Sequence, residues 1–321
     1  MTGIEVESLS KSYRRGLAGE RVQALDGVTL TIAAGEVFGI IGPNGAGKTT
    51  FLGCLLGFLR PDRGRVTIDG RAPDDLAVRR VTGYLPERLV LDRWMTGLDF
   101  LEFHHALAGL PASDRRAQAE AGLAKVGLEG EAGERAIRKY SRGMLQRLGL
   151  AQALLGAPRF VFLDEPASGV DPAGIVLFRR LLAELKGREV TVVLNSHQLD
   201  QVERVCDRVA FVKGGRVEAI ETVSAGSAAA RILRVRWAVS AAPPSTDALR
   251  AAATEASVEL LGADRLGARF AVADDSAAAR VLHALVTAGV PVVEAMPEEG
   301  RLERLFLEPE APVGVPGGGA S

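Results

Sequence analysis

The feature that most constrains this chain is the stretch GPNGAGKTT at residues 42–50, which lies between two apolar runs. It matches the pattern G-x-x-x-x-G-K-[ST], whose glycines let successive backbone N–H groups curl around an anion. A helix that begins near Lys48 would point the positive end of its dipole at the same anion. The stretch therefore predicts a phosphate-binding loop between a buried strand and a helix, and with it an α/β fold.

The same loop provides the first candidate ligand-binding residues. In this pattern the lysine, Lys48, reaches the β- and γ-phosphates of a nucleotide, and the hydroxyl of Thr49 binds Mg²⁺. We therefore expect a nucleoside triphosphate and Mg²⁺ as ligands. The expected nucleotide-binding residues of the loop are Gly42, Pro43, Asn44, Gly45, Ala46, Gly47, Lys48, Thr49 and Thr50.

An acidic pair ends a second apolar run, RFVFLDEP at 159–166. Asp164 at the end of a buried strand would reach the metal, and Glu165 could polarise the water that attacks the γ-phosphate. A strand that ends in a solvated acidic pair is common by itself. With a phosphate-binding loop upstream, the pair predicts nucleotide hydrolysis.

The composition of the chain limits which partners and which cellular compartment this chemistry could have. The 321 residues are 47% hydrophobic and carry a net charge of −1, which gives no overall attraction to nucleic acid or to an anionic membrane. The two cysteines lie in apolar or helical patterns, so we expect a reducing compartment and no disulfide framework. The sequence has neither a signal-peptide pattern nor a run of about 18 apolar residues. Any membrane role must therefore come through a partner.

Strand and helix patterns alternate over residues 1–222, which we predict to form one domain. Short apolar runs at 35–41 and 189–197 indicate further buried strands, and 208–221 indicates a hairpin. The N-terminal strands form an antiparallel β patch in this prediction. Between the strands, a helical pattern predicts a helical subdomain at about 88–155.

The sequence changes in character after this domain. Residues 228–308 are rich in alanine and follow a β-α-β-α-β pattern with a last helix at 301–308, which predicts a small α+β domain. The tail at 309–321 is rich in proline and glycine, and we expect it to be disordered. The small domain is predicted either to regulate or support dimerisation, or to be a passive packing appendage.

The segment 139–155, KYSRGMLQRLGLAQALL, resembles the signature sequence of ABC-type ATPases. The family pattern Leu-Ser-Gly-Gly-Gln-x-Gln-Arg maps onto residues 140–147 and keeps Ser141 and Gly143, while Arg142 replaces the first glycine. Similar departures occur in the branch that powers ABC-2-like exporters. By this resemblance, Ser141 and Gly143 would hydrogen-bond a γ-phosphate at a helix N-terminus.

Other residues resemble family elements in the expected order. Tyr13 lies where an aromatic ring stacks on adenine, and His197 lies where the family has its switch histidine. Glu87 replaces the glutamine that links the γ-phosphate site to the membrane partner, and it is also a candidate Mg²⁺ ligand. Asp171 lies where the family communicates across its dimer. Three further histidines have no assigned role: His104, His105 and His283.

The resemblance covers about residues 3–222. It implies a P-loop NTPase with a RecA-like core, the antiparallel β patch and the helical subdomain. It also implies a head-to-tail dimer around two ATP molecules, formed with a second copy or a close homologue, in which each site pairs one phosphate-binding loop with Ser141 of the other subunit. The chain would act peripherally at the cytoplasmic face of the inner (cell) membrane.

These observations predict an ATP-hydrolysing subunit that drives a separate polytopic membrane subunit of an ABC exporter, with Glu165, His197 and Lys48 as catalytic residues. No nucleic-acid partner is expected. Two alternatives remain open. Segments around Glu87 and Ser141 resemble the ATPase subunit of the copper/sulfur transporter that helps mature nitrous oxide reductase. A soluble ABC ATPase that acts on DNA or ribosomes is the alternative of another class.

Overall fold

The structure is a computed structural model that describes residues 3–15, 20–89, 91–223, 231–238 and 243–297. It divides into two compact units, Met1–Ala225 and Gly226–Ser321. Each unit has a hydrophobic core of its own.

The first unit is built on a six-stranded sheet with the order β5-β6-β7-β3-β8-β9. Its first five strands are parallel, and β9 is antiparallel to β8. Every residue of β3, β6 and β7 is buried, as continuous apolar runs in a sheet covered on both faces should be. The strands are β3 (Val37–Ile41), β5 (Thr82–Leu85), β6 (Phe160–Asp164), β7 (Thr191–Asn195), β8 (Arg208–Lys213) and β9 (Arg216–Thr222).

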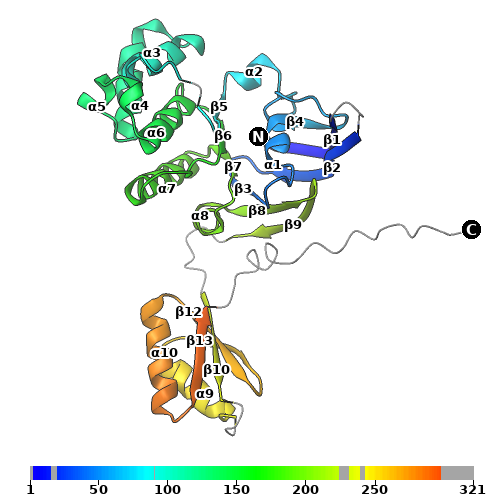
Figure 1. Cartoon of the computed structure of the whole chain (residues 1–321), viewed down its shortest axis with the longest axis vertical. Coiled ribbons are helices and arrows are strands. Elements are labelled where there is room, and N and C mark those ends of the chain that lie inside the picture. Colours follow the sequence, from blue (N-terminus) through cyan, green and yellow to red (C-terminus); the bar gives the residue numbers. More distant parts are fainter. Residues whose placement is uncertain (1–2, 16–19, 90, 224–230, 239–242, 298–321) are drawn as a thin grey trace, which may run out of the picture. The chain divides into compact units, whose positions relative to one another are not determined.

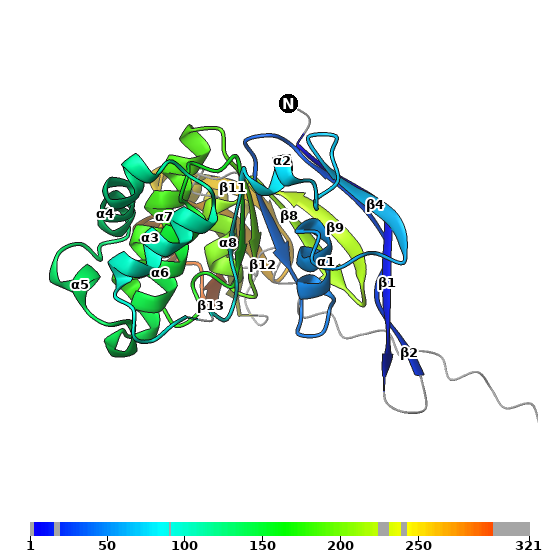
Figure 2. The same cartoon turned by 90° about the horizontal axis from the view of Figure 1, so that it is seen from above.

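A second, three-stranded antiparallel sheet has the order β2-β1-β4, with β1 (Ile4–Arg15), β2 (Glu20–Ile32) and β4 (Arg63–Ile68). Helix α1 (Lys48–Leu55) lies between the two sheets (Figures 1 and 2). Its buried Phe51 belongs to one cluster with Ile4 of β1 and Phe38 of β3. This shared core fixes the start of α1 at the edge of the large sheet.

Figure 2 shows α7 (Pro172–Gly187) and α8 (Leu199–Val205) on the face of the large sheet opposite α1. The predicted helical insert forms a separate group of helices, away from β1, β2 and β4 (Figure 1). The remaining helices of this unit are α2 (Leu76–Arg79), α3 (Gly97–Leu107), α4 (Arg115–Lys125), α5 (Glu131–Glu134) and α6 (Arg142–Ala153), with 3₁₀ turns at Ala112–Asp114 and Ile137–Lys139.

The second unit is a four-stranded antiparallel sheet with the order β11-β12-β10-β13, packed against two helices. Leu233, Val235 and Trp237 alternate along β10 and are all buried, as their spacing predicts. The elements are β10 (Arg231–Trp237), α9 (Thr246–Glu255), β11 (Glu259–Ala263), β12 (Gly267–Val272), α10 (Asp275–Thr287) and β13 (Val292–Pro297).

The predicted β-α-β-α-β order of this unit was wrong by one strand, because β11 adds a hairpin with β12. The connectivity is therefore β-α-β-β-α-β, the split βαβ arrangement. Strand β11 has no regular alternation of buried and exposed residues, and Leu261 on it is exposed. Only Leu260 of this strand is half-buried and packs against the core, so the strand leaves no clear side-chain periodicity in the sequence.

Two predicted features, the helix at 301–308 and the disordered tail at 309–321, lie outside the described residues. Within the part of the chain that the structure describes, no helix combines the length and the apolar character needed to cross a bilayer.

Candidate functional site

A cleft of about 490 Å³ opens at the carboxyl edge of the large sheet. Strands β3, β6 and β7 are parallel neighbours, so the residues that follow them meet at this edge, where open α/β sheets bind ligands. The residues that line the cleft come from both sheets and from the loops between them: Tyr13, Ala24, Asn44, Gly45, Gly47, Lys48, Thr49, Thr50, Glu87, Asp164, Glu165, Ser168, Asn195 and His197.

The predicted phosphate-binding loop connects β3 to α1. Gly47 has a φ of 101°, and a Cβ there would lie 2.2 Å from the backbone oxygen of Ala24, so only glycine fits. The Gly47 carbonyl accepts the N–H of Phe51 at 2.8 Å, which begins the helix directly after the loop. The loop thus has the tight backbone and the helix N-terminus that an anion site requires.

Lys48 is the cation of the cleft. It is only 9% exposed, and its Nζ donates to the backbone oxygens of Gly42 at 2.8 Å and Pro43 at 3.0 Å. Burial lowers the pKa of the Lys48 ammonium, and the nearby carboxylates of Glu165 and Asp164 oppose that shift. The lysine is therefore held against the loop as a partly desolvated charge, where an added phosphate would gain a strong interaction.

Asp164 ends β6 and is 3% exposed. Burial raises the pKa of its carboxyl, and the charges of Glu87 and Glu165 raise it further. One oxygen, Oδ1, accepts a hydrogen bond of 2.6 Å from Nδ2 of Asn195. Such a buried carboxylate among other acids would be stabilised by a divalent cation.

Asn195 is a cleft residue that the sequence reasoning missed. It ends β7 beside Asp164, and its Oδ1 is buried without a hydrogen-bond partner among the described residues. A signal was available, because Asn195 ends an apolar run in the same way that Asp164 does. An unpaired buried acceptor is costly, which points to a ligand or water at this position.

Glu165 has an unusual backbone conformation, with a φ of 51°. The backbone N–H of Glu165 donates to the backbone oxygen of Asn195 at 2.9 Å. The backbone carbonyl of Glu165 accepts the N–H of Ser168 at 3.1 Å. Nδ1 of His197 lies 2.8 Å from Oε2 of Glu165, and this imidazole is half exposed. Left-handed conformations of residues other than glycine concentrate at functional sites, because surrounding contacts must hold them.

Two further predicted residues lie at the rim of the same cleft. Tyr13 on β1 is 40% exposed, and its hydroxyl lies 3.5 Å from Oγ1 of Thr50. Glu87 follows β5 and is exposed. The structure therefore brings the predicted residues Tyr13, Lys48, Thr49 and Glu87 together with the acidic pair at one cleft.

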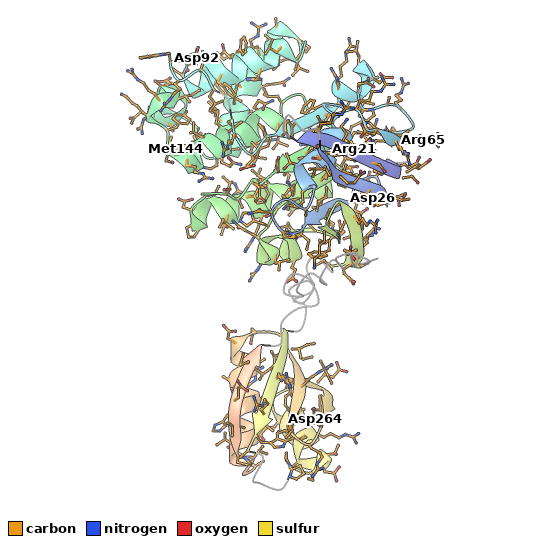
Figure 3. The ribbon with its side chains drawn as sticks, turned by 45° about the vertical axis from the view of Figure 1, so that its right-hand side comes forward. Arg21, Asp26, Arg65, Asp92, Met144 and Asp264 are labelled. Atoms are coloured by element: carbon orange, nitrogen blue, oxygen red, sulfur yellow. The ribbon has the colours of Figure 1, made fainter. Side chains whose placement is uncertain are left out.

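The signature residues are in a different place. Ser141 caps α6, where its Oγ accepts the N–H of Met144 at 3.2 Å, and Asp171 caps α7 in the same way through the N–H of Gly174 at 2.8 Å. Neither residue, nor Gly143, is among those that line the cleft. Figure 3 shows Met144 on the opposite side of this unit from Arg21 and Arg65 of the antiparallel sheet.

The strand–loop–helix at the sheet edge, with a buried lysine after β3 and a buried acid at the end of β6 in the same cleft, defines a P-loop NTPase. Comparison with known families gives a more specific result. The family model described as "ABC transporter" matches residues 25–168. The chain belongs to the ABC transporter ATP-binding proteins, a family of ATPases.

Two relatives illustrate this membership. The uncharacterized ABC transporter ATP-binding protein YxlF of Bacillus subtilis is 42% identical over 216 residues, which cover 67% of this chain and 69% of the relative. The daunorubicin resistance ATP-binding protein DrrA3 of Streptomyces coeruleorubidus is 38% identical over 218 residues, with 67% of each chain covered. The chain spans 64% of the length of a relative from Nostoc and 61% of one from Synechocystis.

Solved structures agree with the fold. The ATP-binding cassette MJ0796, solved as a dimer in a post-hydrolysis state with ADP and Pi, superposes with a TM-score of 0.63. It is 28% identical, and the match covers 68% of this chain and 98% of the cassette. The predicted P-loop NTPase fold is therefore confirmed.

Proposed function

We propose that this chain is the ATP-hydrolysing subunit of an ABC exporter, and that it works as a dimer which drives a separate membrane subunit. One observation carries the proposal. Lys48 and Glu165 line the cleft, whereas Ser141 caps a helix outside it. If Ser141 binds a γ-phosphate, that phosphate must belong to a second subunit, and the dimeric state of the MJ0796 cassette supports this arrangement.

The loop N–H groups and Lys48 would bind the phosphates, and the ring of Tyr13 would stack on adenine. Thr49, Asp164 and Glu87 are the proposed protein ligands of Mg²⁺, which would neutralise phosphate charge when bound. Among the described residues, no three His, Cys, Asp or Glu side chains are grouped to hold a metal alone. This is compatible with Mg²⁺, because Mg²⁺ commonly takes one or two protein ligands together with phosphate oxygens and water.

Glu165 is the proposed group that orients the attacking water, because its carboxylate lies in the cleft beside the metal-binding residues. His197 contacts that carboxylate at 2.8 Å. It would hold Glu165 in position and would also stabilise charge on the γ-phosphate, as would Lys48.

The exporter role rests on the signature sequence and on one relative, DrrA3, which is named for daunorubicin resistance. A similar structure is described as part of the ABC transporter complex cbiONQ, which supports a transporter partner but not a direction of transport. By analogy, Glu87 and Asp171 would pass movement to a polytopic membrane partner and across the dimer, at the cytoplasmic face of the cell membrane. The link to nitrous oxide reductase maturation stays a prediction from two sequence segments.

The variant Glu165→Gln tests the ATPase assignment. It keeps the side-chain volume but cannot act as a base, so we expect turnover to fall at least about 100-fold while ATP binding is retained. ATP hydrolysis and binding of a fluorescent ATP analogue would be measured on the same preparation. Turnover close to that of the wild-type protein would remove Glu165 from the proposed role.

The partner is tested by affinity purification of the chain from native membranes in mild detergent, followed by mass spectrometry. A stoichiometric polytopic membrane protein would support the exporter, and its identity would separate general export from metal-enzyme maturation. Recovery from the soluble fraction with ribosomal proteins or DNA would favour the alternative of a soluble ABC ATPase.

A further inference from the structure

Helix α6 carries Ser141 at its N-terminus, but its side chains also contact the loop that contains Glu165. Arg142 and Gln146 lie four residues apart and therefore share one face of α6. Each donates a hydrogen bond to this loop, at Ser168 and at Glu165. We infer that Arg142 and Gln146 are positioning residues that couple the end of α6 at Ser141 to Glu165 of the same chain. The inference rests on the proposed ATPase function.

Arg142 replaces the first glycine of the signature pattern and lies over the loop. Its Nη2 donates to Oγ of Ser168 at 2.7 Å. Gly169 has a φ of 72°, and a Cβ at this residue would lie 2.5 Å from Cδ and Nε of Arg142. The exposed Arg142 side chain therefore lies close over Gly169, and its guanidinium makes a charge-assisted hydrogen bond to the loop.

Gln146 contacts the other end of the loop. It is buried, and its Nε2 donates to the backbone oxygen of Glu165 at 3.3 Å. A buried amide that lost this partner would be left unsatisfied, so the contact favours one position of the Glu165 peptide. That peptide has the left-handed conformation that its neighbours must hold.

The same loop also forms part of the wall of the cleft. Ser168 lines the cleft, and its N–H donates to the Glu165 oxygen at 3.1 Å. On the other side, Ser141 is the residue directly before Arg142. A phosphate that binds Ser141 would therefore restrain α6, and Arg142 with Gln146 would pass that restraint to Glu165. Each subunit would become competent for hydrolysis only when its α6 is occupied by the nucleotide of the other, and the coupling would be reciprocal.

A double-mutant cycle in the full chain tests this inference. We expect Arg142→Ala to lower kcat about tenfold, the effect of one charge-assisted hydrogen bond, with the ATP concentration at half-saturation changed less than about twofold. Ser168→Ala should have a similar effect, and the double variant should be no slower than either single variant. Arg142→Lys, which retains a charged donor, should recover part of the rate.

The matched control is Arg135→Ala, which removes an arginine that makes one exposed ion pair, to Glu131. It should leave kcat within about twofold, because this pair joins two residues at α5 and does not involve the Glu165 loop. If Arg142→Ala still slowed the Ser168→Ala protein by the full factor, Arg142 would act directly on a phosphate. That result would overturn the positioning role.

Hydrogen exchange on the nucleotide-free protein separates this inference from the proposed function. The amide of Glu165 donates to the backbone oxygen of Asn195 on β7, and the amide of Ser168 donates to the backbone oxygen of Glu165. Their exchange should be about tenfold faster in Arg142→Ala than in the wild-type and Arg135→Ala proteins. Unchanged exchange would overturn the inference whether or not ATP is hydrolysed. Faster exchange in a protein that never hydrolyses ATP would overturn the proposed function alone.

Discussion

The two units of this chain differ in whether polar side chains are buried in them. Every buried polar or charged residue in the described part of the chain lies in the first unit, and the core of the second is apolar throughout. In the first unit Lys48, Asp164 and Asn195 are buried at the cleft. Burial of such groups costs stability unless they are paired, so a buried lysine, carboxyl and amide that line one cleft indicate a site kept for function.

The described residues of the second unit are stabilised by an apolar core and by capped helices. Phe270 of β12 and Leu285 of α10 are fully buried in its core, and its helices have side-chain caps, as at Asp274. The family model matches only residues within the first unit. A regulatory or dimer-supporting role for the second unit therefore stays a prediction.

The largest expected effect comes from Phe270→Ala, which would break the apolar core of the second unit. Loss of a buried phenylalanine costs about 3–5 kcal/mol, enough to unfold a small domain. Calorimetry should show a thermal transition lost or lowered, while binding of a fluorescent ATP analogue stays within about twofold, because the first unit has its own core. Equal loss of both properties would mean that the two units are stabilised together.

Lys48→Met should have the opposite effect in the first unit, with a loss of ATP binding but little change in stability. Methionine removes a partly desolvated charge but also two hydrogen bonds to the loop, so the free energy of unfolding without nucleotide should change by no more than about 1 kcal/mol. ATP affinity should fall at least about tenfold. Urea denaturation and nucleotide titration measure the two quantities. A loss of several kcal/mol in stability would make Lys48 a structural residue.

The smallest expected effect comes from the helix caps, because each unit has a serine cap with the same hydrogen-bond length. Ser141 and Ser245 both accept a backbone N–H at 3.2 Å, from Met144 and Ala248. Replacing either serine by alanine should cost about 1 kcal/mol of stability. Only Ser141→Ala should also reduce ATP hydrolysis, measured as kcat on folded protein. Equal ATPase activity in the two variants would reduce Ser141 to a helix cap.

Much of the first unit could be predicted because its signals are local. The buried strands are continuous apolar runs, and the loop before α1 has fixed spacing that follows from phosphate binding. Strand β11 could not be predicted in this way. Four of its five residues are exposed, so it carries no clear alternation, and its pairing with β12 is visible only in the folded structure.

The sequence by itself determined the phosphate-binding loop, the acid at the end of β6 and the helix that begins at Ser141, because each depends on neighbouring residues. Only the tertiary structure decided which of these meet. Asn195 lies beside Asp164 because β7 is inserted between β6 and β3 in the sheet. Arg142 and Gln146 meet the Glu165 loop because α6 packs against it. Such contacts join residues far apart in the chain, so their pairing depends on strand order and helix packing, which spacing along the sequence does not encode.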